Sequence, residues 1–300
     1  MITEYPSPRF QDIDIWDPAE ILDAMIAGQL CAVAAVRAAL PSLLRAALAV
    51  EQKLRSDGRL IYAGAGTSGR LAVQDGAELM PTFGWPRDRL LLLLAGGDEA
   101  MTRAVEGAED ENTEAVNLVR HHDVGRHDAL VAVAASGTTP FTLAALRAAK
   151  ERGALTIGIA NNAGTPLLEE AEIPILLETG AEPIAGSTRM NAGTAQRVAL
   201  SLLSTLVMIR LGRVYRGVMI DVQSSNRKLE RRKREMLCHL TGAQPDVAAE
   251  ALTRAEGNIR QAVLLLLGCT RDEAHALLAD SGGNLRQAVD QVQRARTSAR

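Results

Sequence analysis

Aromatic residues are scarce in this chain. Three Phe, three Tyr and two Trp make up 3% of its 300 residues, so Leu, Ala, Val and Ile must build the hydrophobic core. So few aromatic side chains also argue against a surface on which nucleic-acid bases stack. The formal net charge of −3 offers no overall attraction to nucleic acid, and we therefore expect no nucleic-acid partner.

Long apolar runs and paired cysteines are also missing. Apolar runs such as Leu90–Ala95 and Val263–Leu267 fall well short of the ~20 residues that span a bilayer. The N-terminus has no basic flank followed by an apolar stretch, so we expect no signal peptide and no membrane anchor. The three cysteines (Cys31, Cys238 and Cys269) lie far apart and lack metal-ligand spacing, which is typical of a reducing cytoplasm.

Five short apolar runs predict a buried, parallel β-sheet. They occupy residues 59–66, 90–97, 128–137, 154–162 and 172–180. Helical stretches separate the runs, and strands that alternate with helices favour an α/β fold whose sheet is covered on both faces. Each run ends in small or polar residues. Ligands of such sheets bind beyond the carboxyl ends of the strands, so we expect a site there.

The chain on either side of these runs is predicted to be helical. Asp17 followed by Pro18 is typical of a helix start. Ala- and Leu-rich periodicity then extends to about Leu54, with a break expected near Pro41. A further long helix is expected after Gly193, where the apolar periodicity resumes.

The C-terminal part contains an internal repeat. The motif GNxRQAV occurs at residues 257–263 and again at 283–289, which indicates two related helical units. Two copies are too few for a solenoid, and we interpret them as a helical cap or dimer contact rather than a separate binding module. We predict three parts: an N-terminal helical arm (1–50), a central sheet domain (51–220) and a C-terminal helical domain (221–300).

Three hydroxyl-rich loops are candidates for binding a phosphate. Gly64–Gly69 and Ser136–Pro140 each follow a predicted strand and open a helix, and Gly186–Arg189 is the third. Glycines let backbone amides approach an anion, hydroxyls add donors, and a helix N-terminus favours negative charge. The candidate substrate contacts in these loops are Gly66, Thr67, Ser68, Ser136, Thr139, Ser187 and Arg189.

The first loop also matches the GxGxxG pattern of dinucleotide-binding folds. Such a fold needs an acidic residue at the end of the next strand to bind the ribose, and here that strand ends in Ala95, Gly96 and Gly97. No GK[ST] follows a glycine loop, which argues against a nucleoside triphosphate. A sugar monophosphate accounts for all three loops together better than a dinucleotide, or than turn and capping chemistry alone.

Glu78 is a candidate general acid. The helix opened by Thr67 is expected to end before Pro81, which places Glu78 in the last turn, near the negative end of the helix dipole. That position and its apolar neighbours disfavour the anionic carboxylate, and a general acid must be protonated near neutral pH. An exposed glutamate at a helix end, with no catalytic role, explains the residue equally well.

A second acidic segment, residues 104–111, has the sequence AVEGAEDE. Such a run is usually a solvated helix face. Gly107 is unusual within a helical pattern, because glycine costs about 1 kcal/mol relative to alanine there, and it suggests the close approach of a substrate or a neighbouring chain. Composition alone does not choose a catalytic base among Glu106, Glu109 and Glu111.

Four segments resemble the N-acetylmuramic acid 6-phosphate etherase family of the sugar isomerase (SIS) domain superfamily. They are GRLIYAGAGTSGRLAVQDGAE (58–78), AGGDEAMTRAVEGAED (95–110), AASGTTP (134–140) and GSTRMNAGTAQR (186–197). Their order and spacing also match, and the resemblance covers nearly all of the chain. It implies a three-layer αβα SIS domain with a five-stranded parallel sheet, an N-terminal helical arm and a small all-α C-terminal domain.

The resemblance implies a reaction that needs neither a metal nor an organic cofactor. Enzymes of this family cleave the ether between D-lactate and C3 of N-acetylmuramate 6-phosphate, by elimination across C2–C3 of the opened sugar and addition of water. The family pattern makes Glu78 the general acid and Glu109 the general base. It assigns phosphate and sugar contacts to Ser68, Ser136, Thr139 and Ser187. The family also forms dimers with sites near the subunit interface, so we expect a homodimer.

Three positions depart from the family pattern. The family usually has a basic residue where Thr138 stands and Lys where Asn191 stands, and residues 3–16 differ from its usual opening. The two lost basic residues leave room for a shifted substrate within the phosphosugar class. Two alternatives remain: a non-catalytic phosphosugar sensor that resembles glucokinase regulatory protein, and an aldose–ketose isomerase. The sensor does not need both glutamates, and the isomerase does not explain AVEGAED.

Overall fold

A computed structural model describes residues 1–222 and 227–298 of the chain. Residues 223–226 and 299–300 of the predicted C-terminal domain lie outside the described residues. Contacts group the chain into two compact units. One comprises Met1–Ala77 with Arg87–Val207, and the other comprises Glu78–Pro86 with Met208–Arg300. The expected arm thus falls in the same unit as the sheet, and the three-part division stays a prediction.

The first unit contains the predicted sheet. Its five strands are all parallel and follow the order β2 (Leu90–Leu94), β1 (Leu60–Gly64), β3 (Ala129–Val133), β4 (Leu155–Ala160) and β5 (Ile173–Leu176). The central strands are buried along their whole length, which explains their continuous apolar sequences. The α/β prediction is therefore confirmed. The order 2-1-3-4-5 reverses its direction of growth between β1 and β3, where ligands of such sheets bind.

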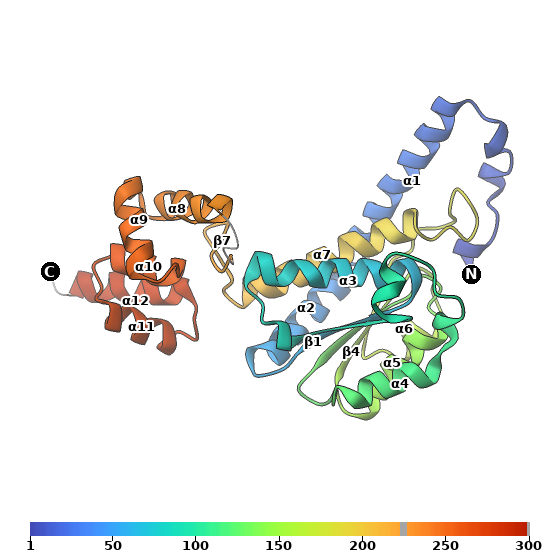
Figure 1. Ribbon diagram of the computed structural model, residues 1–300. Coiled ribbons are helices and arrows are strands. Elements are labelled where there is room, and N and C mark those ends of the chain that lie inside the picture. The colour runs from blue at the N-terminus through green and yellow to red at the C-terminus, as the bar shows by residue number, and fades with distance from the viewer. Residues whose placement is uncertain (223–226, 299–300) are drawn as a thin grey trace. The chain divides into compact units, whose positions relative to one another are not determined.

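Helices cover both faces of this sheet, as Figure 1 shows. On one face lie α4 (Asn112–His121), α5 (Pro140–Glu151) and α6 (Pro166–Glu170), and on the other lie α2 (Leu40–Arg55), α3 (Gly66–Phe83) and α7 (Asn191–Arg210). The first face packs Ile61, Ala63 and Leu130 of the strands against Phe141 and Leu146 of α5, all of them buried. Small and branched aliphatic residues thus build this core, as the shortage of aromatics predicts.

The second face carries a polar connection among its helices. Tyr62 of β1 donates a hydrogen bond from its hydroxyl to Asp75 Oδ2 of α3 at 2.8 Å, and Arg197 of α7 lies 3.5 Å from Asp75 Oδ1. Burial and the neighbouring Asp75 carboxylate raise the pKa of Tyr62 well above its ordinary value, so Tyr62 is a neutral donor to Asp75. The contact fixes α3 against β1, and α3 carries the first phosphate-loop candidate at its start.

The N-terminal helices begin where the sequence predicts. Asp17 caps α1 (Pro18–Ala38) by accepting a hydrogen bond from the Ala19 amide at 2.9 Å. The predicted break falls at Ala39, because Pro41 sits in the first turn of α2, where its missing N–H costs nothing. The short 3₁₀ helices of the chain are η1 (Ile2–Glu4), η2 (Pro8–Phe10), η3 (Ile13–Ile15), η4 (Arg87–Arg89), η5 (Gly97–Met101) and η6 (Ala108–Asp110).

Among the described residues, two helices, α1 and α7, are long and apolar enough by composition to cross a membrane. Core helices of soluble proteins meet the same criterion, and 56% of the most apolar stretch of α7 is buried in the structure. The corresponding stretch of α1 is only 17% buried. The apolar face of α1 is therefore a surface that needs a separate explanation.

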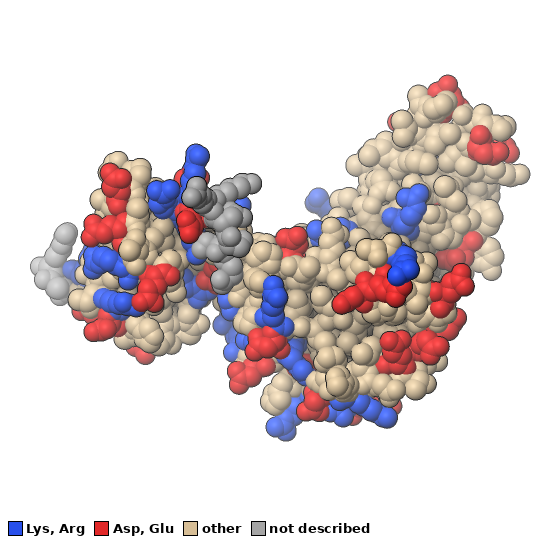
Figure 2. Space-filling view, in the orientation of Figure 1, with Lys and Arg blue, Asp and Glu red and all other residues tan. Residues whose placement is uncertain are grey.

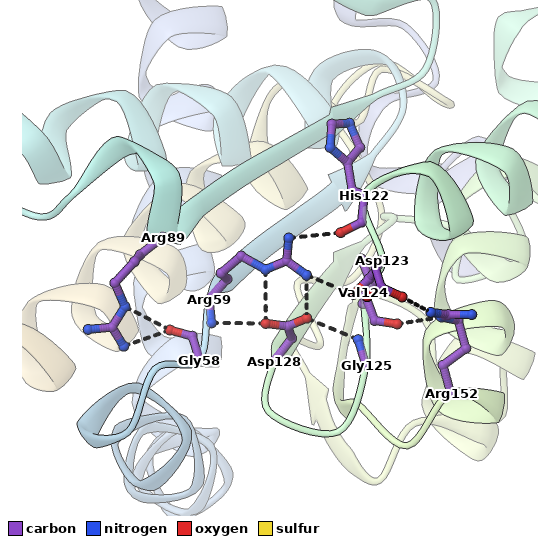
Figure 3. Close-up of polar contacts among 9 residues, drawn as sticks. All are labelled: Gly58, Arg59, Arg89, His122, Asp123, Val124, Gly125, Asp128 and Arg152. Atoms are coloured by element: carbon purple, nitrogen blue, oxygen red, sulfur yellow. Dashed lines mark hydrogen bonds and ion pairs between the residues drawn. The ribbon is translucent and has the colours of Figure 1, made fainter.

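A cluster of charged groups lies at the amino ends of the central strands, opposite to their carboxyl ends (Figure 3). Arg59 and Asp128 come directly before β1 and β3. The Arg59 guanidinium donates to both oxygens of Asp128, at 3.1 and 2.7 Å, and Asp128 also accepts from the amides of Arg59 and Gly125, each at 3.0 Å. The buried Asp128 carboxylate thus links the residues at the starts of β1 and β3.

Over its described residues, the second unit is helical apart from a short hairpin. It contains β6 (Val214–Tyr215), β7 (Val218–Met219), α8 (Arg227–Thr241), α9 (Pro245–Arg254), α10 (Ile259–Leu266), α11 (Arg271–Asp280) and α12 (Leu285–Ser298). The sequence repeat has a structural reason. Asn258 and Asn284 each accept a hydrogen bond from the amide three residues later, at 3.1 and 3.2 Å, and so start α10 and α12 in the same way. The next apolar positions of both repeats lie in one buried core.

Candidate active site

A polar cavity of about 400 Å³ lies at the carboxyl ends of the strands in the first unit. Its lining comes from the loops after β1 and β3, the acidic segment, the third hydroxyl loop and the N-terminal segment. The lining residues are Met1, Glu4, Ala65, Gly66, Thr67, Ser68, Glu109, Asp110, Ala135, Ser136, Thr138, Thr139, Pro140, Gly186 and Thr188. Five of the seven predicted substrate contacts are among them.

The first loop brings the start of α3 directly to the cavity. The helix begins at Gly66, two residues after β1 ends, and its first N–H groups have no acceptor within the helix. Gly69 makes the tight connection possible, because a Cβ there would lie 2.7 Å from the Gly64 carbonyl oxygen. Backbone amides and the hydroxyls of Thr67 and Ser68 therefore line the cavity together, an arrangement suited to an anion.

The second loop presents hydroxyls from the neighbouring strand. Ser136 Oγ accepts a hydrogen bond from the Thr138 amide at 3.2 Å and lies 3.4 Å from Thr139 Oγ1. Thr139 is the residue before α5, whose first helical residue is Pro140. Thr138 is exposed and lines the cavity, so the position at which the family usually has a basic residue faces this cavity.

The third loop contributes Gly186 and Thr188 rather than the two residues predicted from the sequence. Ser187 is half-buried and Arg189 is exposed, and neither lines the cavity. The reason is the local backbone: the Ser187 amide bonds to the Ile184 carbonyl at 2.9 Å, and the Gly186 amide bonds to the Thr3 carbonyl at 2.9 Å. Gly186 and Thr188 therefore line the cavity, and Ser187 and Arg189 do not. The loop has no regular secondary structure, so its sequence does not indicate which of its residues line the cavity.

A buried glutamate that the sequence did not single out holds the start of α7. Glu182 accepts hydrogen bonds from the amides of Asn191 and Ala192, at 2.9 and 2.8 Å. Burial raises the pKa of Glu182 and the nearby Glu4 carboxylate adds to this, while the two backbone hydrogen bonds act in the opposite direction. The N-terminus of a helix favours an anion, and at the start of α7 the Glu182 carboxylate occupies that position.

Asn191 stands where the family usually has Lys, and here it is structural. It is buried, and its Oδ1 accepts a hydrogen bond from Gln29 of α1 at 3.0 Å. Gly28 leaves room for it, because a Cβ at Gly28 would lie 2.7 Å from Asn191 Oδ1. Asn191 does not line the cavity, and its side chain connects α1 to α7.

The acidic segment forms a loop instead of the expected helix face. Ala104 and Val105 are irregular, Glu106 and Gly107 form a turn, and η6 follows. Gly107 has φ 74°, a left-handed conformation that glycine adopts readily, and a Cβ there would meet nothing within 4 Å. No described part of the chain itself approaches Gly107 closely, and the close approach of a substrate or a neighbouring chain stays a prediction. Gly107 is needed for the backbone turn that presents Glu109.

A second cavity, of about 450 Å³, adjoins the first. The two share Ala65, Gly66, Thr67 and Glu109. The second is lined mainly by small apolar residues, and Arg70 is its cationic residue among those described. Of the three open candidates for a base, Glu109 lines both cavities, Glu106 lines the second, and Glu111 lines neither.

Glu78 lies elsewhere. The prediction that its helix ends before Pro81 is wrong, since α3 continues to Phe83 with the proline inside it. The end is stabilised by Gly84 in a left-handed conformation and by a 3.2 Å hydrogen bond from the amide of the buried Trp85 to Leu79 O. Glu78 is exposed and lines neither cavity.

The residues that the sequence missed at this cavity come from distant parts of the chain. Met1 precedes η1 and Glu4 ends it, and Asp110 follows the predicted base. No motif or periodicity singles out the N-terminal segment, because only the folded chain brings it beside the loops of β3 and β4. Among the residues that the structure describes, no group of three or more His, Cys, Asp or Glu side chains is arranged to hold a metal ion.

The sheet order, the cavity at its reversal point and the hydroxyl loops define a protein of the SIS-domain class. Two family models match the chain: the SIS domain over residues 113–206, and the glucokinase regulatory protein N-terminal SIS domain over residues 42–150. A phosphoheptose isomerase from Francisella tularensis has the same fold, with a TM-score of 0.50, 19% identity, and coverage of 65% of this chain and all of that one.

Curated relatives narrow the class to one family. An N-acetylmuramic acid 6-phosphate etherase from Deinococcus radiodurans is 48% identical over 264 residues, which is 88% of this chain and 87% of the relative. The protein of the same name from Rubrobacter xylanophilus is 42% identical over 267 residues, 89% of each chain. The chain belongs to the N-acetylmuramic acid 6-phosphate etherase family.

Proposed function

We propose that the protein is a carbon–oxygen lyase that cleaves the D-lactyl ether of N-acetylmuramate 6-phosphate to N-acetylglucosamine 6-phosphate and D-lactate. The observation that carries the proposal is one cavity that combines hydroxyl-rich phosphate loops with Glu109, in a chain 48% identical to an etherase. We also propose that it acts in the cytoplasm, because charged sugar phosphates do not cross a bilayer unaided.

The proposed reaction has two balanced stages. In the first, Glu109 removes the proton at C2, the C3–O bond breaks as C2=C3 forms, and an acid protonates the departing lactate oxygen. The aldehyde of the opened sugar makes the C2 proton acidic enough for a carboxylate. In the second, water adds its hydroxyl to C3 and a proton returns to C2. Each positioned acid or base typically accelerates such a step by ~10²–10⁴-fold.

Binding of the phosphate would hold the sugar in register for this chemistry. The amides at the start of α3 and the hydroxyls of Ser68, Ser136 and Thr139 are the proposed phosphate and sugar contacts. Ser187 and Arg189 remain proposals from the resemblance. The adjoining cavity suits the lactyl group: alanine side chains would surround its methyl group, and Arg70 would face its carboxylate. Two Arg70 nitrogens already donate to the Ala100 and Arg103 carbonyls, which orient the guanidinium.

A direct assay tests the activity. With N-acetylmuramate 6-phosphate we expect one D-lactate for each N-acetylglucosamine 6-phosphate, and in ¹⁸O-labelled water one labelled oxygen at C3 of the sugar. A second candidate is a non-catalytic phosphosugar sensor, favoured by the match to the glucokinase regulatory protein domain. A sensor would bind N-acetylglucosamine 6-phosphate and release no D-lactate from the substrate, which would overturn the lyase proposal.

We propose that the protein is a homodimer that covers an apolar surface of the first unit. Leu22, Ile26, Leu30 and Val33 of α1 are exposed at spacings that place them on one helix face. An apolar hollow of about 610 Å³ between α2 and α7 is lined by leucines that include Leu44 and Leu202. The surface over α1 carries few charged side chains in Figure 2. Exposed apolar surface of this extent is typical of a protein–protein interface.

Charge substitutions on this surface test the dimer. Replacing Leu30 and Leu202 with glutamate together is expected to yield monomers, because two buried charges without partners would oppose association. Sedimentation velocity gives the mass of each species. Asn117→Asp on the exposed side of α4 is a matched control and should leave the wild-type mass unchanged. A wild-type protein that already sediments as a monomer at micromolar concentration would contradict the proposal.

The dimer would also bring a general acid to the site. Because Glu78 is exposed and lines neither cavity of its own chain, we propose that it completes the site of the partner subunit. Mixing inactive Glu78→Gln and Glu109→Gln proteins after reversible dissociation is then expected to restore roughly a quarter of the wild-type rate, since half of the dimers are mixed and each has one intact site. Lactate release is the readout. No recovery in verified mixed dimers would contradict the shared site.

A further inference from the structure

The N-terminal segment is fastened to the site by a buried threonine. Thr3 is fully buried, and its hydroxyl accepts a hydrogen bond from Asn162 Nδ2 at 2.9 Å, while its amide lies 3.4 Å from Asn162 Oδ1. The Thr3 carbonyl accepts from the Gly186 amide at 2.9 Å. Asn162 in turn donates to the Ala135 carbonyl, beside Ser136. The segment is therefore tied to the loops that follow β3 and β4.

This anchor positions the carboxylate of Glu4 at the cavity. Glu4 lines the cavity together with Gly186 and Thr188. The Thr3 hydroxyl donates to Glu4 Oε1 at 3.1 Å, and Glu4 Oε2 lies 3.3 Å from the point that a Cβ on Gly186 would occupy. The side chain is thus held from one side by Thr3 and fits against the bare backbone of Gly186.

The charge of the cavity determines what Glu4 is suited to bind. The described residues that line this cavity include three carboxylates, Glu4, Glu109 and Asp110, and no Lys or Arg. A carboxylate repels a phosphate and, when ionised, only accepts hydrogen bonds. Its complement is therefore a neutral donor, such as a sugar hydroxyl or an amide N–H. Glu4 lies on the third-loop side, whereas the amides and hydroxyls suited to the phosphate come from the starts of α3 and α5.

We infer that Glu4 is a specificity-determining residue that binds hydroxyl groups of the sugar, and that Thr3 and Asn162 are positioning residues for it. The inference rests on the proposed function. On this inference the N-terminal segment forms one side of the sugar-binding site. The segment selects a polyhydroxylated sugar phosphate over smaller phosphates, because Glu4 attracts hydroxyl donors and repels a bare anion.

Binding measurements separate the sugar from the phosphate. Calorimetric titration of the intact protein with N-acetylglucosamine 6-phosphate and, separately, with inorganic phosphate gives both affinities without turnover. For Glu4→Ala we expect the sugar phosphate to bind about 10- to 100-fold more weakly, because hydrogen bonds to a charged group are lost. Inorganic phosphate should bind equally well or more tightly. Glu4→Gln should fall between the wild type and Glu4→Ala, since its carbonyl oxygen still accepts.

Two further variants keep the inference testable. Thr3→Val keeps the shape and loses the hydroxyl contacts, so it should raise KM for N-acetylmuramate 6-phosphate in the same direction as Glu4→Ala and leave kcat nearly unchanged. Glu151→Ala, an exposed glutamate at the end of α5, is the matched control and should behave as wild type. Equal losses for sugar phosphate and inorganic phosphate, or no loss for either, would overturn the inference. Absence of lactate release by the wild type would instead overturn the proposed function.

Discussion

Replacing Glu109 with glutamine is expected to reduce D-lactate release by at least ~10²-fold and by up to ~10⁴-fold, the range typical of a lost general base. Glutamine has nearly the same shape and cannot accept the C2 proton. Glu109 is exposed in the loop that begins with Gly107, so its loss removes no buried contact and the fold should be retained. An unchanged thermal unfolding midpoint, together with the lost rate, is the expected result.

An isotope experiment assigns the defect to proton removal. In D₂O the wild-type product should carry deuterium at C2, and substrate incubated with the Glu109→Gln protein should show no exchange there. Glu111→Gln is the matched control, because Glu111 lies two residues away and lines neither cavity. A full rate in the Glu109 variant, or a larger loss in the Glu111 variant, would show that the base has been misassigned.

Replacing Asp128 with alanine is expected to have the largest effect on stability. Asp128 is 4% exposed and accepts hydrogen bonds from the Arg59 side chain and from two backbone amides (Figure 3). Removing the Asp128 carboxylate leaves these donors, near the starts of β1 and β3, without their acceptor. Because Arg59 remains partly accessible to water, we expect a loss of about 2–4 kcal/mol in the free energy of unfolding, below the full cost of an isolated buried charge.

Urea denaturation measures this loss as a lower midpoint at unchanged slope. Arg147→Ala is the matched control, since its ion pair with Glu170 has a similar 2.5 Å contact but side chains that are 52% and 32% exposed. Exposed pairs contribute about 1 kcal/mol or less, so the control should change little. Equal effects of the two substitutions would contradict a special role for the buried carboxylate.

The pH dependence of the Asp128 effect follows from its pKa. Burial alone would raise the pKa of Asp128, but hydrogen bonds from the Arg59 side chain and from the Gly125 and Arg59 amides outweigh it and hold the pKa below its ordinary value. A lowered pKa in the folded state contributes stability that is fully present above the unfolded-state pKa, about 4. That contribution is lost as the pH falls through the folded-state pKa. The difference between wild type and Asp128→Ala should therefore shrink below about pH 4.

The fold was largely predictable because local rules and burial agree along most of the chain. The five apolar runs became the five parallel strands, and Asp17 with Pro18 marked the start of α1. Prediction was wrong where tertiary contacts outweigh a local rule. Pro81 did not end α3, because packing of Trp85 beyond it stabilises a further turn and its Gly84 cap. Gly107 marked a left-handed turn rather than a defect in a helix.

At the site, the sequence by itself indicated that the loops after β1 and β3 are suited to an anion. Glycines and hydroxyl residues directly after a predicted strand show this without knowledge of distant contacts. Only the tertiary structure brought those loops, Glu109 and Glu4 to one cavity, which Glu78 does not line. The physical reason is that residues far apart in the chain meet through the packing of the sheet and the buried anchor of Thr3. The scarce aromatics, fixed by composition, agree with a cavity lined by amides, hydroxyls and carboxylates.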